Sequence, residues 1–394
     1  MRTRSTATRP SASSSSPATR GDRRLARFVI LGNPWNRRVT LFAEALAEAG
    51  QPPPEVVPWL DLLRDPARLR ASDPGPALVR IDSFGEDFDV ERELLARGGF
   101  PGAHALEERR GEVIAPAVAH RGFQRALAEL DAVFTERPAW TVLNPPGEIA
   151  ELFDKRRTSR RFRDAGVPVP EFLSEVPTSA AALLDACRAC GWRQVFVKPT
   201  MGSSASGVLL LNVGAKGAVI RTSLEWDAPR WFNNLRLSHY RAPADVARAL
   251  DFVLAQGAQV ERAVPKARLD GDYFDLRVLC IAGEPRFVVV RQNAHPITNL
   301  HLGGRRGNLD ALHAALRPGA WEAMLATCRT VASLYRSLHV GLDVLFEEDL
   351  TQHRVIEANA FGDLLPNLTV DGRSVYRWEI DAALELGTRA AAVR

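Results

Sequence analysis

The stretch "VFVKPTMGSSASGVLLL", residues 195–211, decides how the rest of the chain is interpreted. A run of β-branched and aromatic residues ends on Lys198, a loop of glycine, serine and alanine follows, and a second aliphatic run begins near Val208. This pattern predicts two buried strands joined by a loop of small residues. The lysine stands out, because only four of the 51 basic residues are lysine.

At the end of a buried strand, a lysine can serve a chemical role for which arginine is less suited. Its compact ammonium group on a flexible stem suits contact with a phosphate oxygen in a confined site. The glycine and serine residues after it let backbone N–H groups approach a polyphosphate closely. The loop is not a Walker A motif, because Lys198 precedes the loop instead of following it. A hairpin turn with an exposed lysine explains the same pattern, so both interpretations stay open at this point.

A second group of polar residues lies in two β runs further along the chain. Asp343 is set inside "VGLDVLF", and Glu357 and Asn359 are two apart in "HRVIEANA". Residues two apart on a strand point to the same face. Three oxygen ligands on adjacent strands suit Mg²⁺, which keeps waters and shares phosphate oxygens. A salt bridge to an arginine such as Arg354 is the alternative.

The stretch "FDLRVLCIAGEPRFVVVRQ" predicts an antiparallel hairpin that carries two arginines and an aspartate. Asp275 and Arg277 share one face of the first strand, and Arg291 closes the second strand. Arginines that project toward a Gly-rich loop can clamp the oxygens of a phosphoryl group during its transfer. Surface ion pairing on the hairpin is the alternative.

In their order along the chain, these segments resemble the ATP-grasp superfamily, and most closely its ribosomal-protein glutamate ligase and glutathione synthetase branch. The resemblance is carried by Lys155, by Lys198 with its loop, and by "QVERAV", "DLRV", "NLHLGG", "GLDV" and "VIEANA", over roughly residues 140–370. It implies an α/β N-terminal domain with a parallel sheet, followed by an ATP-grasp domain in which two α+β subdomains clasp ATP.

The resemblance also implies a role for each matching residue. Lys155 and Lys198 would contact the ATP phosphates, and Asp275 would hold the ribose. The hinge whose backbone reads adenine would be Glu261, Arg262, Ala263 and Val264, and the loop that closes over the phosphates would contain Gly202, Ser203 and Ser204. The catalytic set would be Arg277, Arg291 and Asn299, and the Mg²⁺ ligands would be Asp343, Glu357 and Asn359, with Mn²⁺ as the alternative ion.

The implied function is that of an ATP-dependent carboxylate–amine or carboxylate–thiol ligase. Such an enzyme forms an acyl-phosphate and releases ADP and phosphate. Its substrate would be an amino acid, a peptide or another small carboxylate, and homo-oligomers are frequent among such ligases. The alternative is an ATP-binding regulatory protein with the same fold and no ligase activity.

The order of predicted elements divides the chain into three parts. We expect a tail over residues 1–26, an N-terminal α/β domain over 27–145 and an ATP-grasp domain over 146–394, with subdomains of about 146–257 and 258–394. The stretch 148–166 reads as one helix ended by Gly166. The polar stretch 214–243 reads as an insertion between a strand and a helix, with its aromatic residues packed inward.

Composition limits the environment and the partners of the folded part. The net charge is +4, but residues 1–26 carry six arginines against Asp22, which leaves the rest at +4 − 5 = −1. The folded part therefore offers no basic face for nucleic acid, and the Arg/Ser-rich tail lacks the aliphatic residues needed to fold. There is no apolar run of about 18 residues for a membrane span. Four cysteines in 394 residues favour a reducing cytoplasm over a disulfide framework.

Overall fold

The computed structural model describes residues 25–85, 87–202, 206–215, 217–362 and 365–393. Most of the 1–26 tail, as well as Ser203 and Ser204 of the predicted phosphate loop, lies outside the described residues. No described helix has the length and apolar character that crossing a bilayer requires.

The first layer is a four-stranded sheet in which all neighbouring strands are parallel, as expected, with the order β2-β1-β3-β4. Its strands are β1 (Phe28–Leu31), β2 (Glu55–Val57), β3 (Ala77–Ile81) and β4 (Trp140–Val142). The helices that join these strands are α1 (Arg37–Glu48), α2 (Trp59–Arg64), α3 (Phe88–Gly98) and α4 (Pro116–Thr135), with the short turns η1 (Pro66–Ala71) and η2 (Ala103–Ala105).

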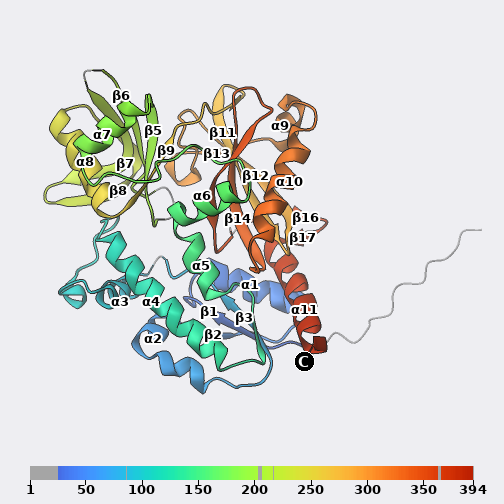
Figure 1. Ribbon diagram of the computed structural model, residues 1–394. Coiled ribbons are helices and arrows are strands. Elements are labelled where there is room, and N and C mark those ends of the chain that lie inside the picture. Colours follow the sequence, from blue (N-terminus) through green and yellow to red (C-terminus); the bar gives the residue numbers. More distant parts are fainter. Residues whose placement is uncertain (1–24, 86, 203–205, 216, 363–364, 394) are drawn as a thin grey trace, which may run out of the picture.

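Both faces of this parallel sheet are covered, because alternate residues of β1 enter two different cores. Val29 and Leu31 share a core with α3 and α4, whereas Phe28 and Ile30 pack with α1 and with α11 (Val375–Val393). The sequence had not predicted α11, which returns from the far end of the chain to lie along α1 (Figure 1). A small two-stranded sheet, β16 (Thr369–Val370) and β17 (Arg373–Ser374), precedes this helix.

The second layer is a five-stranded antiparallel sheet of order β8-β7-β6-β5-β9. Its strands are β5 (Gln194–Pro199), β6 (Leu209–Val213), β7 (Ala218–Asp227), β8 (Arg230–Tyr240) and β9 (Ala258–Arg262). Two helices, α7 (Ala180–Ala189) and α8 (Pro243–Ala255), pack on one face and form a separate core with it.

The polar stretch expected as an insertion forms the β7–β8 hairpin, which widens this sheet. The strand β8 was not predicted, because an edge strand with one exposed face lacks a continuous apolar run. The expected inward packing of its aromatic residues is confirmed for Trp231, which is buried and stacks on Phe252 of α8 with 5.1 Å between the ring centroids.

The third layer is a six-stranded sheet of order β13-β12-β11-β14-β15, with β10 paired to β11. Its strands are β10 (Arg268–Leu269), β11 (Asp272–Ile281), β12 (Glu284–Asn293), β13 (Arg305–Arg306), β14 (His339–Phe346) and β15 (His353–Asn359). The short turn η3 (Leu300–Leu302) and the helices α9 (Leu309–Ala315) and α10 (Ala320–Ser333) complete this part. The predicted antiparallel hairpin of β11 and β12 is confirmed.

The stretch 148–166 is not one helix, and this part of the prediction is wrong. It forms α5 (Pro146–Leu152) and α6 (Lys155–Asp164), which are separated at Phe153 and Asp154. The Asp154 carboxylate accepts a hydrogen bond of 3.0 Å from the backbone N–H of Arg157, so aspartate starts a second helix instead of continuing the first. Lys155 consequently becomes the first residue of α6.

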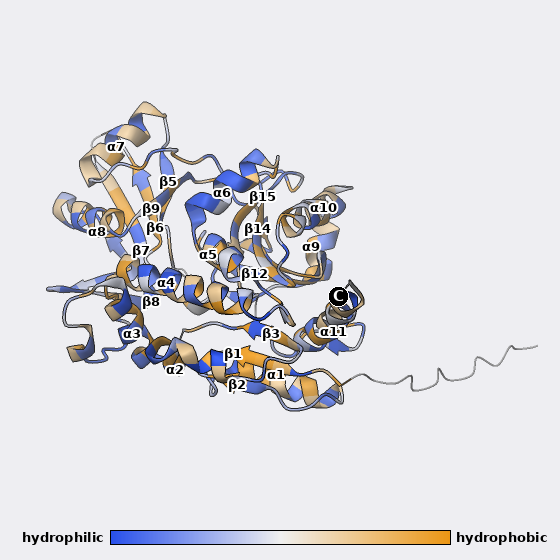
Figure 2. Ribbon diagram, turned by 60° about the horizontal axis from the view of Figure 1, so that its bottom comes forward, coloured by the Kyte–Doolittle hydropathy of each residue, from blue (hydrophilic) through white to orange (hydrophobic). Residues whose placement is uncertain are grey.

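The two antiparallel sheets stand next to each other, and α5 and α6 run between them above the parallel sheet (Figures 1 and 2). The domain division stays a proposal, but one boundary needs adjustment. Because β9 pairs with β5, we place the end of the first subdomain after Arg262 instead of after residue 257.

Candidate active site

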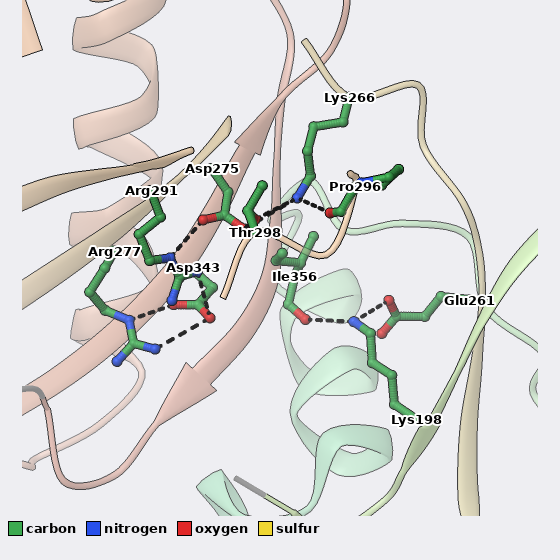
Figure 3. A network of polar contacts seen from close by, with 10 residues as sticks. All are labelled: Lys198, Glu261, Lys266, Asp275, Arg277, Arg291, Pro296, Thr298, Asp343 and Ile356. Atoms are coloured by element: carbon green, nitrogen blue, oxygen red, sulfur yellow. Dashed lines mark hydrogen bonds and ion pairs between the residues drawn. The ribbon is translucent and has the colours of Figure 1, made fainter. Parts of the chain in front are cut away.

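The site lies where the five-stranded and six-stranded sheets face each other. Lys155 comes from the start of α6, and its Nζ lies 3.2 Å from Oε1 of Glu357 on β15. Lys198 comes from β5, and its Nζ lies 3.4 Å from the backbone oxygen of Ile356, also on β15 (Figure 3). Two of the four lysines of the chain thus meet at one strand of the opposite sheet.

Lys198 is buried and is held by a carboxylate of its own sheet. Its Nζ donates a 2.6 Å hydrogen bond to Oε2 of Glu261, which is also buried. Burial alone would lower the pKa of Lys198, but the charges of Glu261 and Glu357 outweigh burial and raise it. The ammonium form is therefore kept in a dry site, and the alternative of an exposed hairpin lysine is wrong.

Lys155 joins the start of the small-residue loop to the opposite sheet. Its Nζ donates 2.7 Å to the backbone oxygen of Gly202, and its backbone N–H donates 3.0 Å to the oxygen of Thr200. The cation therefore lies against both the loop expected to cover phosphates and the acidic strand β15.

Asp343 is clamped by the two arginines of the predicted catalytic set (Figure 3). Nε of Arg277 lies 2.6 Å from Oδ1 of Asp343, and Nη2 of Arg291 lies 3.0 Å from Oδ2. Burial would raise the pKa of Asp343, but the two guanidinium groups lower it below its ordinary value. Arg277 faces Asp343 directly across the β11–β14 pair, so the register creates this contact.

Asp275 lies on β11, two residues before Arg277, and its carboxylate accepts hydrogen bonds from several side chains. Its Oδ1 accepts 2.7 Å from Nε of Arg291, its cross-strand partner, and its Oδ2 accepts from Lys266 at 3.2 Å and from the hydroxyl of Thr298. Burial opposes ionisation, but Arg291 and Lys266 lower the pKa of Asp275 well below its ordinary value. Contact with a ribose stays a prediction, and the contacts found here are internal to the protein.

The predicted adenine hinge spans the end of β9 and the two residues after it, and two of its backbone N–H groups already have partners. The backbone N–H of Arg262 donates 2.8 Å to the oxygen of Glu171, and that of Ala263 donates 2.9 Å to the oxygen of Gln194. The Arg262 side chain is exposed and pairs with the carboxylate of Glu171 at 3.1 Å. A purine at this hinge would therefore depend on the remaining backbone groups of residues 261–264.

The residues expected to hold Mg²⁺ lie on one face of the β14–β15 pair. Asp343 faces Glu357 directly, and Asn359 follows two residues after Glu357, which confirms the shared face. The buried Nδ2 of Asn359 has no hydrogen-bond partner within the described part of the chain.

The described residues contain no cluster of three His, Cys, Asp or Glu side chains suited to a metal ion. The donor set is instead two carboxylates and an amide, and these hard oxygens fit Mg²⁺ that completes its shell with water and phosphate. The alternative of a salt bridge to an arginine is met at Asp343, but by Arg277 and Arg291, whereas Arg354 pairs with Glu347 at 2.7 Å.

Two buried residues of the site were not predicted from the sequence. Gln259 faces Lys198 directly on β9, and both side-chain amide atoms are buried without a partner among the described residues. Lys266 lies between β9 and β10 and contacts Asp275. The rarity of lysine was a usable signal for Lys266, whereas a glutamine two residues before Glu261 carries no distinctive pattern. Asn299 is half-buried in the segment that follows Thr298.

Comparison with known proteins supports this architecture at the level of fold. No protein-family model and no curated protein sequence matches the chain. The crystal structure of D-cycloserine synthetase DcsG is similar with a TM-score of 0.54 and 15% identity, over 92% of this chain and 100% of that one. The ATP-grasp ligase PsnB, complexed with a minimal precursor, Mg and ADP, has a TM-score of 0.51 and 15% identity, over 92% of this chain and 98% of that one.

A third similar structure is the macrocyclase MdnC from Microcystis aeruginosa MRC bound to its precursor peptide MdnA, with a TM-score of 0.50 and 10% identity over 92% of this chain and 99% of that one. In all three comparisons, the similarity covers nearly the whole of both chains. The N-terminal parallel sheet followed by two antiparallel sheets is the ATP-grasp fold.

Proposed function

We propose that this protein is an ATP-dependent ligase that joins a carboxylate to an amine, or to a thiol, through an acyl-phosphate. The observation that carries the proposal is the contact of Lys155 and Lys198 with β15, the strand that also presents Glu357 and Asn359. A single triphosphate with Mg²⁺ would bridge these groups, since its negative oxygens suit the lysines and its metal suits the acids.

The pairing of opposite charges in the site supports this assignment. Four cations of the predicted set lie beside carboxylates: Lys155 with Glu357, Lys198 with Glu261, and both Arg277 and Arg291 with Asp343. On binding of Mg·ATP, the cations would exchange carboxylate for phosphate oxygens, and Asp343 and Glu357 would hold the metal. The site therefore stays near neutrality both with and without the nucleotide, which limits the cost of keeping charges in a dry place.

The chemistry follows from what these residues hold in place. A carboxylate oxygen of the substrate attacks the γ-phosphorus, and the bond from that phosphorus to the β–γ bridging oxygen breaks, which gives an acyl-phosphate and ADP. The amine then attacks the acyl carbon, phosphate leaves with the C–O bonding electrons, and the amine loses a proton. Bound Mg²⁺ would neutralise charge on the β- and γ-phosphate oxygens. The protein supplies position and positive charge, mainly from Lys155, Lys198, Arg277 and Arg291.

For the substrates, we propose chemical classes and not individual compounds. The similar structures named above include a ligase in complex with a minimal precursor, a macrocyclase bound to a precursor peptide, and a D-cycloserine synthetase. We therefore propose a carboxylate substrate that is an amino acid, a peptide or another small acid.

The test is an ADP-release assay with purified full-length protein, ATP and Mg²⁺ over a panel of carboxylates paired with amines or thiols. The expected result is ADP release that requires one acid and one nucleophile together, with a product mass equal to their sum less water. Tight Mg·ADP binding without ADP release from any pair, while a known ligase responds to the same panel, would favour the regulatory alternative.

A further inference from the structure

Lys266 is a buried cation that the proposed chemistry does not use. Its side chain is 7% exposed, and it lies between β9 and β10. Its Nζ makes three contacts, which match the three hydrogen atoms of an ammonium group: 3.2 Å to Oδ2 of Asp275, 2.9 Å to the backbone oxygen of Pro296 and 3.0 Å to Oγ1 of Thr298. With all three hydrogen atoms engaged, the ammonium group holds Asp275, Pro296 and Thr298 in place relative to one another.

The first thing it fixes is the orientation of Arg291. Asp275 uses Oδ2 for Lys266 and Thr298, which leaves Oδ1 for Nε of Arg291 at 2.7 Å. With Nε held in this way, the guanidinium plane of Arg291 is set, and Nη2 reaches Asp343 at 3.0 Å. A chain of contacts therefore runs from Lys266 through Asp275 to the arginine proposed to stabilise the γ-phosphate (Figure 3).

Lys266 also fixes the segment 296–302, which connects β12 to β13 and packs against the five-stranded sheet. Lys266 holds this segment to the six-stranded sheet through Pro296 and Thr298. On the other side, Ile297 and Leu302 form a small buried cluster with Leu210 of the five-stranded sheet. The segment also carries Asn299, so its position affects both the closure of the site and one member of the proposed catalytic set.

We propose that Lys266 is a positioning residue that sets Arg291 and the segment 296–302 for phosphoryl transfer. This inference rests on the proposed function of the site. A buried ion pair adds little net stability compared with an apolar replacement of the same volume, so stability alone is a weak reason to keep a charge here. Preorganisation of a group that acts on the transition state is a better reason, because reacting charges need fixed partners.

The test separates nucleotide binding from recognition of the transferring phosphoryl group. The variant Lys266→Met removes the ammonium and keeps an unbranched side chain, and Thr298→Val removes the hydroxyl that bridges Lys266 and Asp275. The control is Arg268→Met, which removes an exposed cation from the adjacent strand β10. Calorimetry on the full chain gives the affinity for Mg·ADP alone and for Mg·ADP with aluminium fluoride, which mimics a phosphoryl group in transfer.

We expect Lys266→Met to bind Mg·ADP within about twofold of the wild type and to lose about 10- to 100-fold of the additional affinity conferred by aluminium fluoride, the range typical of residues that orient a functional group. Thr298→Val should change the affinities in the same direction by a smaller factor, and Arg268→Met should match the wild type. If Lys266→Met is too unstable to measure, Thr298→Val decides.

Two results would overturn the inference. One is an unchanged gain from aluminium fluoride in both variants. The other is an equal loss of affinity for Mg·ADP with and without aluminium fluoride, which would mean that Lys266 acts on the nucleotide itself. A wild-type protein that binds no Mg·ADP would instead reject the proposed function.

Discussion

The ammonium group of Lys155 lies 3.2 Å from Oε1 of Glu357, although one residue begins a helix before the five-stranded sheet and the other lies on the last long strand of the six-stranded sheet. This contact ties α6 to β15, and Lys155 also bonds to Thr200 and Gly202 in the loop that follows β5. It depends on the break at Asp154, which ends α5 and places Lys155 at the start of a new helix.

Variants at Lys198 and Glu261 should distinguish an effect on protein stability from an effect on nucleotide binding. Lys198→Met alone leaves the buried Glu261 carboxylate without its 2.6 Å partner, which should cost about 3–5 kcal/mol of unfolding free energy. The double variant Lys198→Met/Glu261→Gln removes both charges, so it should recover much of that stability and still fail to turn over ATP. Thermal unfolding and ADP release measure the two effects, with Glu261→Gln as the control. Wild-type turnover in the double variant would remove Lys198 from phosphate binding.

Arg291 should matter for the chemical step more than for ATP affinity. Arg291 contacts the carboxylates of Asp275 and Asp343 through two nitrogens of one planar guanidinium group. The variant Arg291→Lys keeps the positive charge but loses this planar group, so it should not hold both carboxylates in the same geometry. We expect kcat to fall about 10²- to 10³-fold, the range seen when one donor to a developing charge is lost, with a small change in KM for ATP. The matched control, Arg354→Lys, lies in the same sheet and pairs with Glu347. A fall in ATP affinity that accounts for the whole effect would contradict this role.

His120 should make the protein less stable in mild acid. Burial lowers the pKa of His120 from 6.5 to about 4, against the opposing charge of Asp154. The unfolded chain therefore binds a proton between these pH values that the folded chain rejects, so the free energy of unfolding falls as the pH falls from 6.5 to 4 and then levels off. The contribution is about 3 kcal/mol at most.

The check is chemical denaturation at several pH values with His120→Phe. Phenylalanine suits this position because His120 stacks on Phe153 and also lies near Phe123. The variant should lose less stability between pH 6.5 and 4 than the wild type. Parallel pH profiles for the two proteins would show that His120 is not the group responsible.

Much of the site could be predicted from local sequence pattern. The period of two in "VIEANA" placed Glu357 and Asn359 on one face, and the register with β14 adds Asp343 to it. The buried strand before Lys198 was also visible as a run of apolar residues. In each case the decisive information lies within a few neighbouring residues.

The remaining features depend on pairing between distant segments. The contact of Arg277 with Asp343 follows from the pairing of β11 with β14, which no short pattern specifies. The strand β8 escaped prediction because its outward residues are polar, and the break at Asp154 escaped it because an aspartate in a run of good helix formers does not by itself end a helix.

If the proposed function is right, one nucleotide with Mg²⁺ lies between the lysines and the acids of β14 and β15. The most direct measurement is calorimetric titration of the full chain with a non-hydrolysable ATP analogue, with and without Mg²⁺, for the wild type and for Glu357→Gln. The claim predicts a single site whose affinity rises strongly with Mg²⁺ in the wild type, and a variant that needs far more Mg²⁺ for the same gain, because one of its oxygen ligands carries no charge. Absence of analogue binding to the wild type, or an identical Mg²⁺ dependence in both proteins, would contradict it.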